Sequence, residues 1–153
     1  MNAYQWLTGN MKQSGSIKVA LDDDARFPTK GFAADAGFDL YSREDAVIEP
    51  GKSWVFNTGV HMAIPEGICG LIVGKSGLNV VYDAQSSGLI DSGYTGAIHI
   101  KLYNHGEKTL EIKKGQKISQ IVLLPIIMPV LCLVKSLEAT QRGDGGFGST
   151  GKF

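Results

Sequence analysis

The sequence predicts an all-β domain, and three observations support this prediction. The chain consists of short runs rich in apolar and β-branched residues, separated by turns that contain glycine or proline. No stretch of a dozen residues keeps a period of 3.6, so a long amphipathic helix is not expected. The length of 153 residues is typical of one domain with a sizeable core. Many short strands of this kind indicate a sandwich or barrel.

The expected strands follow one another along the chain. Residues 17–21 come first, because apolar and polar residues alternate there as in a half-buried strand. Further strands are predicted over residues 46–49, 53–64, 68–73, 97–103, 109–112, 117–124 and 130–134. Within the longest run, we expect Trp54, Phe56, Val60 and Met62 to share one face and to point into the core.

Composition excludes several classes of function. Lysine plus arginine equals aspartate plus glutamate, 15 each, so no net field favours polynucleotides or membranes. The apolar run at 121–134 is interrupted by Pro125 and Pro129 and is too short to span a bilayer. Cys69 and Cys132 lie in apolar runs and are expected to be buried, reduced thiols. With no signal peptide visible, we expect a cytoplasmic protein, of a cell or of a virus or prophage acting in the host cytoplasm.

Residues 142–151 form the most unusual segment. Five of these ten residues are glycine, which excludes a helix or an ordinary strand. The segment offers free backbone N–H groups and Arg142 for oxyanions, and Phe147 for stacking on a base. It is therefore predicted to be a lid that closes over a phosphorylated, ring-bearing ligand; the alternative is a disordered linker.

Two internal segments are rich in small and polar residues. Residues 74–78 (GKSGL) place the Lys75 ammonium beside exposed backbone, which suits a phosphate or only a solvated turn, and the spacing is not that of a P-loop. Residues 88–96 (GLIDSGYTG) place Asp91 in a tight turn before Tyr94. Asp91 is either a general base or the start of an Asx turn, and the local sequence leaves both readings open.

Taken in order, five segments resemble the motifs of the trimeric dUTPase family, the deoxyuridine triphosphate nucleotidohydrolases. They are residues 36–40 (AGFDL), 75–78 (KSGL), 88–96 (GLIDSGYTG), 115–120 (GQKISQ) and 142–151 (RGDGGFGSTG). The resemblance covers about residues 16–151. It implies a jelly-roll-like β-barrel, the dUTPase-like β-clip, in a homotrimer whose C-terminal strand and tail are exchanged between subunits. The implied divisions are an N-terminal extension (1–15), the barrel domain (16–136) and a flexible Gly-rich lid arm (137–153).

The resemblance also implies the reaction. Members of this family hydrolyse dUTP to dUMP and pyrophosphate with Mg²⁺, which keeps uracil out of DNA. Asp91 is the implied general base for in-line attack by water, and Asp39 would act on the metal only through water. The implied substrate-binding residues are Lys75, Ser76, Gly77, Gly88, Leu89, Ile90, Tyr94, Gln120, Arg142, Phe147, Gly148, Ser149 and Thr150.

Two departures from the family pattern keep alternatives open. Lys75 stands where arginine is usual, which removes the planar fork for bidentate phosphate binding, and Gly93 replaces a frequent second aspartate. A non-catalytic or regulatory trimer that senses dUTP is therefore the first alternative. A dCTP deaminase relative is the second, although no matching glutamate follows the second motif. Gln85 and His99 stay unassigned, and His61 is expected to be an ordinary strand-face residue. No polymeric nucleic acid and no membrane is expected as a partner.

Overall fold

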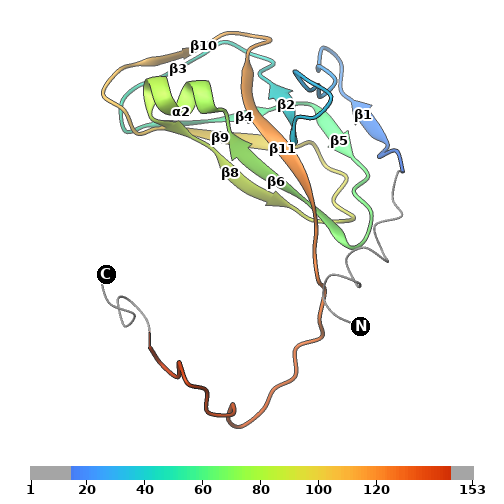
Figure 1. The fold of residues 1–153 in the computed structure, drawn as a ribbon. Coiled ribbons are helices and arrows are strands. Elements are labelled where there is room, and N and C mark those ends of the chain that lie inside the picture. Colours follow the sequence, from blue (N-terminus) through green and yellow to red (C-terminus); the bar gives the residue numbers. More distant parts are fainter. Residues whose placement is uncertain (1–14, 146–153) are drawn as a thin grey trace.

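The computed structural model describes residues 15–145 and places in them eleven strands and one helix (Figure 1). In chain order these are β1 (Val19–Leu21), β2 (Gly37–Tyr41), β3 (Ala46–Ile48), β4 (Ser53–Asn57), β5 (Val60–Met62), β6 (Ile68–Gly74), α2 (Ser76–Tyr82), β7 (Ala84–Gln85), β8 (Ser87–Ile90), β9 (His99–Asn104), β10 (Leu110–Ile112) and β11 (Lys117–Pro125).

All strand pairs in the described part are antiparallel and form four small sheets. The largest has the order β2-β11-β6-β8, the next has β4-β9-β7, and β1-β5 and β3-β10 form pairs. None of these sheets closes on itself. The core lies between them and contains Leu40 and Ile121 of the largest sheet together with Phe56, Ile100 and Leu102 of the β4-β9-β7 sheet. The predicted all-β, jelly-roll-like fold is confirmed.

A β-bulge in β11 determines which of its side chains face the core. Lys117 lies opposite Tyr41 and Ser119 lies opposite Leu40, so β11 has one more residue here than β2. Side chains alternate between the two faces of a regular strand, so Ile118 and Ile121 would point in opposite directions and could not both enter the protein core. The bulge allows both to be fully buried. It also places Lys117 on the same face of the sheet as Gln120.

Close packing between β6 and β11 depends on a glycine. A Cβ atom at Gly70 of β6 would lie only 2.6 Å from Cδ1 of Ile121 in the neighbouring strand. The absence of a side chain at Gly70 therefore lets Ile121 fill the space beside β6. Strand β6 is itself paired on both sides, with β11 and with β8.

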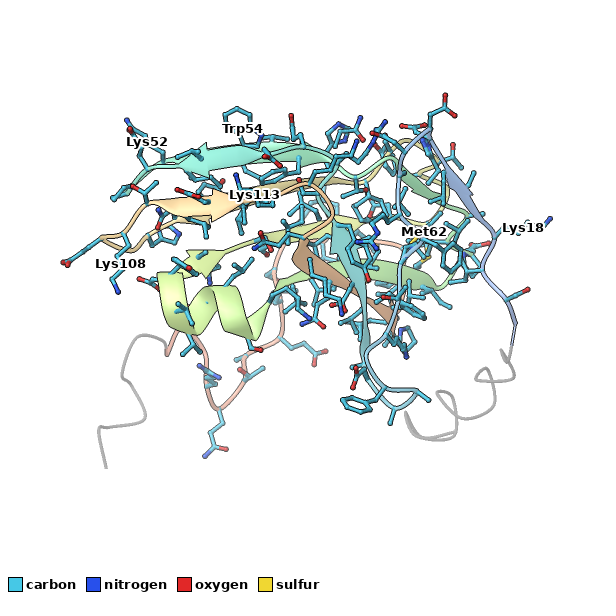
Figure 2. All side chains as sticks on the ribbon, turned by 90° about the horizontal axis from the view of Figure 1, so that it is seen from above. Lys18, Lys52, Trp54, Met62, Lys108 and Lys113 are labelled. Atoms are coloured by element: carbon cyan, nitrogen blue, oxygen red, sulfur yellow. The ribbon has the colours of Figure 1, made fainter. Side chains whose placement is uncertain are left out.

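Several expectations about individual residues were wrong. Trp54 (labelled in Figure 2) is 41% exposed rather than buried, although its ring centroid lies 6.5 Å from that of Phe56; its indole N–H donates to Glu44 (3.2 Å). The run at 53–64 is not one strand, because Gly59 has a φ of 65° and separates β4 from β5. Phe56, Val60 and Met62 are buried as predicted.

The chain beyond β11 departs from the body as an extended segment (Figure 1). Its last backbone contact with the body is the hydrogen bond from Ile126 N–H to the Gly67 carbonyl (2.9 Å). The strand expected at 130–134 is not formed within this chain: Val130 is 94% exposed and Leu133 is fully exposed. The expectation that Cys132 is buried was wrong for the same reason, whereas Cys69 is buried. In residues 15–145 no helix is long and apolar enough to cross a membrane.

Candidate functional site

Asp39 is the centre of a charged cluster at one end of the largest sheet. Its side chain is 6% exposed, and each carboxylate oxygen accepts a hydrogen bond from a lysine. Lys75 Nζ lies 2.6 Å from Oδ1, and Lys117 Nζ lies 2.6 Å from Oδ2. One carboxylate and two ammonium groups leave the cluster with one surplus positive charge.

The cluster changes the titration of its members. Burial pushes the pKa of Asp39 upward, but the hydrogen bonds from Lys117 and Lys75 outweigh this effect and hold the pKa below its ordinary value. The same hydrogen bond from Lys117 to Asp39 raises the pKa of Lys117. Asp39 is therefore a carboxylate and Lys117 a cation at neutral pH. Such a site attracts anions.

The strand registers bring Gln120 and the second motif to the same place. Gln120 of β11 lies opposite Asp39 of β2 on one side and opposite Val73 of β6 on the other. Its amide nitrogen donates to the Gly74 carbonyl (3.3 Å). A Cβ atom at Gly37 would lie 2.6 Å from Gln120 Oε1, so the glycine of the first motif makes room for this side chain.

Lys75, Ser76 and Gly77 form the junction between β6 and α2. Lys75 is extended (φ −78°, ψ 128°) and precedes the first helical residue. Ser76 and Gly77 are exposed, and no heavy atom lies within 4 Å of the position that a Gly77 Cβ would occupy. The first turn of a helix also leaves backbone N–H groups without carbonyl partners. These groups lie beside the positive cluster and suit an oxyanion.

The third motif lies at the other end of the same sheet. Gly88, Leu89 and Ile90 belong to β8, where Ile90 pairs with Gly70 and Gly88 pairs with Ile72. Asp91 follows the strand and is exposed, and its backbone carbonyl accepts a turn hydrogen bond from Tyr94 N–H (3.3 Å). The tight turn predicted before Tyr94 is confirmed.

A single chain does not bring the third motif to the positive cluster. Along β6, Ile90, the residue before Asp91, pairs with Gly70, and Lys75 of the second motif follows Gly74. At about 3.3 Å per residue, these positions are roughly 13 Å apart. Asp91 and Lys75 therefore lie at opposite ends of one sheet, farther apart than a catalytic base and a phosphate ligand of one centre.

The tail contributes nothing to either group within the described chain. Arg142 is exposed, and its Nε donates to the Gly145 carbonyl of its own turn (3.0 Å). Figure 1 shows this segment away from the sheets. Phe147, Gly148, Ser149 and Thr150, which were predicted to bind substrate, lie outside the described residues.

Metal ligation by the protein itself does not fit the described side chains. Residues 15–145 contain no group of three or more His, Cys, Asp or Glu side chains that could hold an ion. Both oxygens of Asp39 face lysine ammonium groups, and these would repel a cation that approached the carboxylate directly. The role of Asp39 towards Mg²⁺ through water stays a prediction.

Sequence reasoning missed Lys117. The one sequence signal for a role of Lys117 is its position in the fourth motif, of which only Gln120 is expected to bind substrate. The bulge that places Lys117 beside Asp39 could not be recognised from the local pattern. Gln85 and His99, to which the sequence assigns no role, lie in the β4-β9-β7 sheet. Gln85 is in β7, and His99 begins β9, with its Nδ1 2.9 Å from the Ala97 carbonyl oxygen.

Comparison with known proteins gives a consistent result. The family model described as dUTPase matches residues 23–151. The chain is 46% identical over 141 residues to a deoxyuridine 5'-triphosphate nucleotidohydrolase of Clostridium tetani, covering 90% of this chain and 97% of that one. It is 40% identical over 135 residues to the enzyme of that name from Mus musculus, covering 88% of this chain and 83% of that one.

Solved structures agree with the sequence relatives. The dUTPase of Staphylococcus bacteriophage 80alpha with dUPNHPP superimposes with a TM-score of 0.82 at 31% identity, covering 90% of this chain and 99% of that one. It is described in a study of phage dUTPases that control transfer of virulence genes. A dUTPase mutant from phage phi11 of S. aureus, described with a structural Mg(II) ion, superimposes with a TM-score of 0.75 at 29% identity, covering 82% of this chain and all of that one.

Proposed function

This chain belongs to the dUTPase family, and we propose that it hydrolyses dUTP to dUMP and pyrophosphate at sites that subunits of a homotrimer build together. The observation that supports a shared site is the distance along β6 between Gly70, which pairs with the residue before Asp91, and Gly74, which precedes Lys75. This distance is about 13 Å. A second copy of the chain can supply the half that one chain leaves distant. Hydrolysis of dUTP keeps uracil out of DNA.

The exposed segment after β11 supports assembly. Val130, Leu131, Leu133 and Leu137 are each at least 87% exposed in the single chain. Contiguous apolar surface of this kind marks an interface rather than a solvated tail. We propose that residues 130–134 add to a neighbouring subunit as a strand. Residues 137–153 would then continue as a lid arm over a neighbour's site. The chain would thus consist of an N-terminal extension (1–15), the barrel domain (16–136) and this arm.

The positive cluster would bind the triphosphate. Lys117 can neutralise Asp39 while Lys75 turns towards a phosphate oxygen, because the cluster carries one more positive than negative charge. Ser76 and Gly77 would donate to oxygens near the scissile bond, and Gln120 to another phosphate oxygen. Charge-assisted hydrogen bonds of this type are the strong ones in anion binding.

The third motif would bind the nucleoside and activate water. Backbone groups of Gly88, Leu89 and Ile90 would pair with the uracil edge, and Tyr94 would pack under the deoxyribose. Fixed backbone donors and acceptors reject a wrong base because its mismatch leaves buried polar groups unpaired. Asp91 would take a proton from water as the water oxygen attacks the α-phosphorus, and the bond to the pyrophosphate oxygen would break.

The tail would complete the site. Arg142 would clamp the γ-phosphate with two parallel N–H donors. Phe147 would stack on the uracil, and Gly148, Ser149 and Thr150 would add N–H and hydroxyl donors. A Mg²⁺ ion would arrive bound to the phosphates of dUTP, where it neutralises charge.

Pyrophosphate release tests the activity. We expect release from dUTP with Mg²⁺ and little release from dCTP, dTTP or UTP. A sensing protein is the second candidate, because Lys75 is paired with Asp39 and so holds phosphate less firmly. Binding of dUTP without pyrophosphate release would support that candidate. Deamination of dCTP would instead indicate the deaminase relative.

Complementation tests the shared site. Lys75→Met and Asp91→Asn are each expected to be nearly inactive, because each removes one half of every site. When the two variants are co-expressed in equal amounts, one of the three sites in each mixed trimer, about a quarter of all sites, receives an intact half from each of two subunits. Recovered activity supports sites between subunits. Activity no higher than that of either variant, in trimers shown by mass spectrometry to be mixed, would place each site within one chain.

A further inference from the structure

His61 of β5 has an oxygen acceptor at each ring nitrogen. Nδ1 lies 2.7 Å from the Thr95 carbonyl oxygen, and Nε2 lies 3.0 Å from Asp22 Oδ1. A neutral imidazole has one N–H and can donate to only one of these oxygens, whereas the imidazolium donates to both. The two contacts together therefore require the charged ring.

The charged groups around His61 favour this protonation state. The hydrogen bond to the Thr95 carbonyl raises the pKa of His61 first, and the hydrogen bond to Asp22 raises it further. Asp22 also accepts from Arg43 Nη1 (3.2 Å), which limits the negative charge that it presents to the ring. His61, Asp22 and Thr95 line a surface hollow of about 420 Å³. Lys18 also lines it, but Figure 2 shows the Lys18 side chain pointing away from the body.

Thr95 belongs to the turn that carries Tyr94. Residues 91–97 lie outside every strand, so the turn is positioned by individual contacts. Gly93 N–H donates to the Ile64 carbonyl (3.4 Å), and the Tyr94 hydroxyl donates to the Ala97 carbonyl (3.0 Å). His61 adds a side-chain contact from β5 to the backbone next to Tyr94.

We propose that His61 is a positioning residue whose imidazolium holds the Tyr94 turn against β5. This inference rests on the proposed function in one respect, namely that Tyr94 contacts the nucleoside. When the pH rises through the pKa of His61, the ring keeps one N–H, and the Asp22 carboxylate, the stronger acceptor, retains it at Nε2, so the hydrogen bond from Nδ1 to the Thr95 carbonyl is lost. The turn then loses one of its attachments to the body, and dUTP binds less tightly.

Kinetics of His61→Gln tests the proposal, because glutamine offers a single donor group and no titration. Below the pKa of His61, we expect KM for dUTP to rise about fivefold in this variant, the order of one lost hydrogen bond, with kcat nearly unchanged. In the wild type, KM should rise by a similar factor as the pH passes the pKa, and this step should be absent from the variant. His105→Gln is the matched control, since His105 stacks on Tyr103 at the far end of β9. Equal KM values and pH profiles for His61→Gln and wild type would overturn the proposal.

Nuclear magnetic resonance tests the positioning without catalysis, so a failure of the proposed function is recognised separately. The chain has three histidines, and the His61 signal is identified by its loss in His61→Gln. We expect the Tyr94 and Thr95 amide signals to shift with the titration of the His61 ring. In Asp22→Asn the midpoint of both titrations should move to lower pH, because the negative charge is removed. Amide signals that ignore the His61 titration would overturn the inference even in an active enzyme.

Discussion

Lys75 and Asp39 form an ion pair with 2.6 Å between Nζ and Oδ1, although they are 36 positions apart in the chain. Lysine stands here in place of the arginine usual in the second motif. A single ammonium cannot present a planar fork to a carboxylate and a phosphate together. If Lys75 binds phosphate as proposed, the pair connects stability and phosphate binding through one side chain.

The first prediction concerns Lys75. Lys75→Arg should lower KM for dUTP about fivefold, because a guanidinium can donate to Asp39 and to phosphate at the same time. Lys75→Met should raise KM at least about tenfold by removing a charged donor. Steady-state kinetics measures both, with Lys113→Met as the control at a lysine whose side chain is 68% exposed. An unchanged KM in Lys75→Met would show that Lys75 does not bind substrate.

Asp39→Asn should lower the free energy of unfolding at pH 7 by roughly 2 kcal/mol, because two charged hydrogen bonds to a nearly buried group are weakened. Asp45→Asn is the matched control: Asp45 is 62% exposed and pairs with Lys113, so its loss should cost much less than that of Asp39. Urea unfolding gives both values. Equal losses in the two variants would mean that burial adds nothing to the Asp39 pairs.

The pH dependence of stability follows from the lowered pKa of Asp39. The unfolded chain binds a proton at Asp39 near the ordinary value of 3.8, while the folded chain binds it only at lower pH. Stability from Asp39 is therefore fully present above about pH 5 and is lost as the pH falls through 3.8 towards the folded pKa. The stability difference between wild type and Asp39→Asn should shrink over this window. A difference that stays constant down to pH 3 would contradict the lowered pKa.

Asp91→Asn should bind dUTP yet release pyrophosphate at least about a hundredfold more slowly, since asparagine cannot accept the proton from water. Binding is measured by calorimetry and turnover by pyrophosphate release. Asp23→Asn is a suitable control, because Asp23 is exposed and its backbone carbonyl, not its side chain, accepts from Arg43. Near-normal turnover in Asp91→Asn would remove this residue from the base role.

Phe147→Ala should weaken dUTP binding by about tenfold, which is the order of one lost base–aromatic stack. The barrel should stay folded, as judged by an unchanged circular dichroism spectrum and melting temperature. Kinetics equal to those of the wild type would show that the tail does not act as a lid.

The fold class and most strand positions could be predicted because alternating side chains and Gly/Pro turns are local signals. The helix α2 could not, since Ser76–Tyr82 contains Gly77 and the β-branched Val80 and Val81, which have low helix propensity. Leu78 alone among its residues is buried, so tertiary packing rather than sequence defines this helix.

The site was predictable in its parts but not in its arrangement. Motif resemblance identified Asp39 and Lys75 separately. Their direct contact, and the second lysine at Asp39, depend on the registers of β2, β11 and β6, which side-chain patterns do not encode. The distance between Asp91 and the cluster likewise follows from the pairing of β8 with β6.

The bulge in β11 means that the register of one strand, and not residue identity alone, determines the net charge of the cluster around Asp39. If β11 kept all its residues but ran as a regular strand from Lys117 to Ser119, Lys117 would lie on the same face as Ser119 and Ile121, and its ammonium would point into the hydrocarbon interior. Asp39 would then keep one counterion, and the cluster would become neutral. Pairing without the bulge would thus abolish anion attraction while leaving every ionisable side chain in the chain.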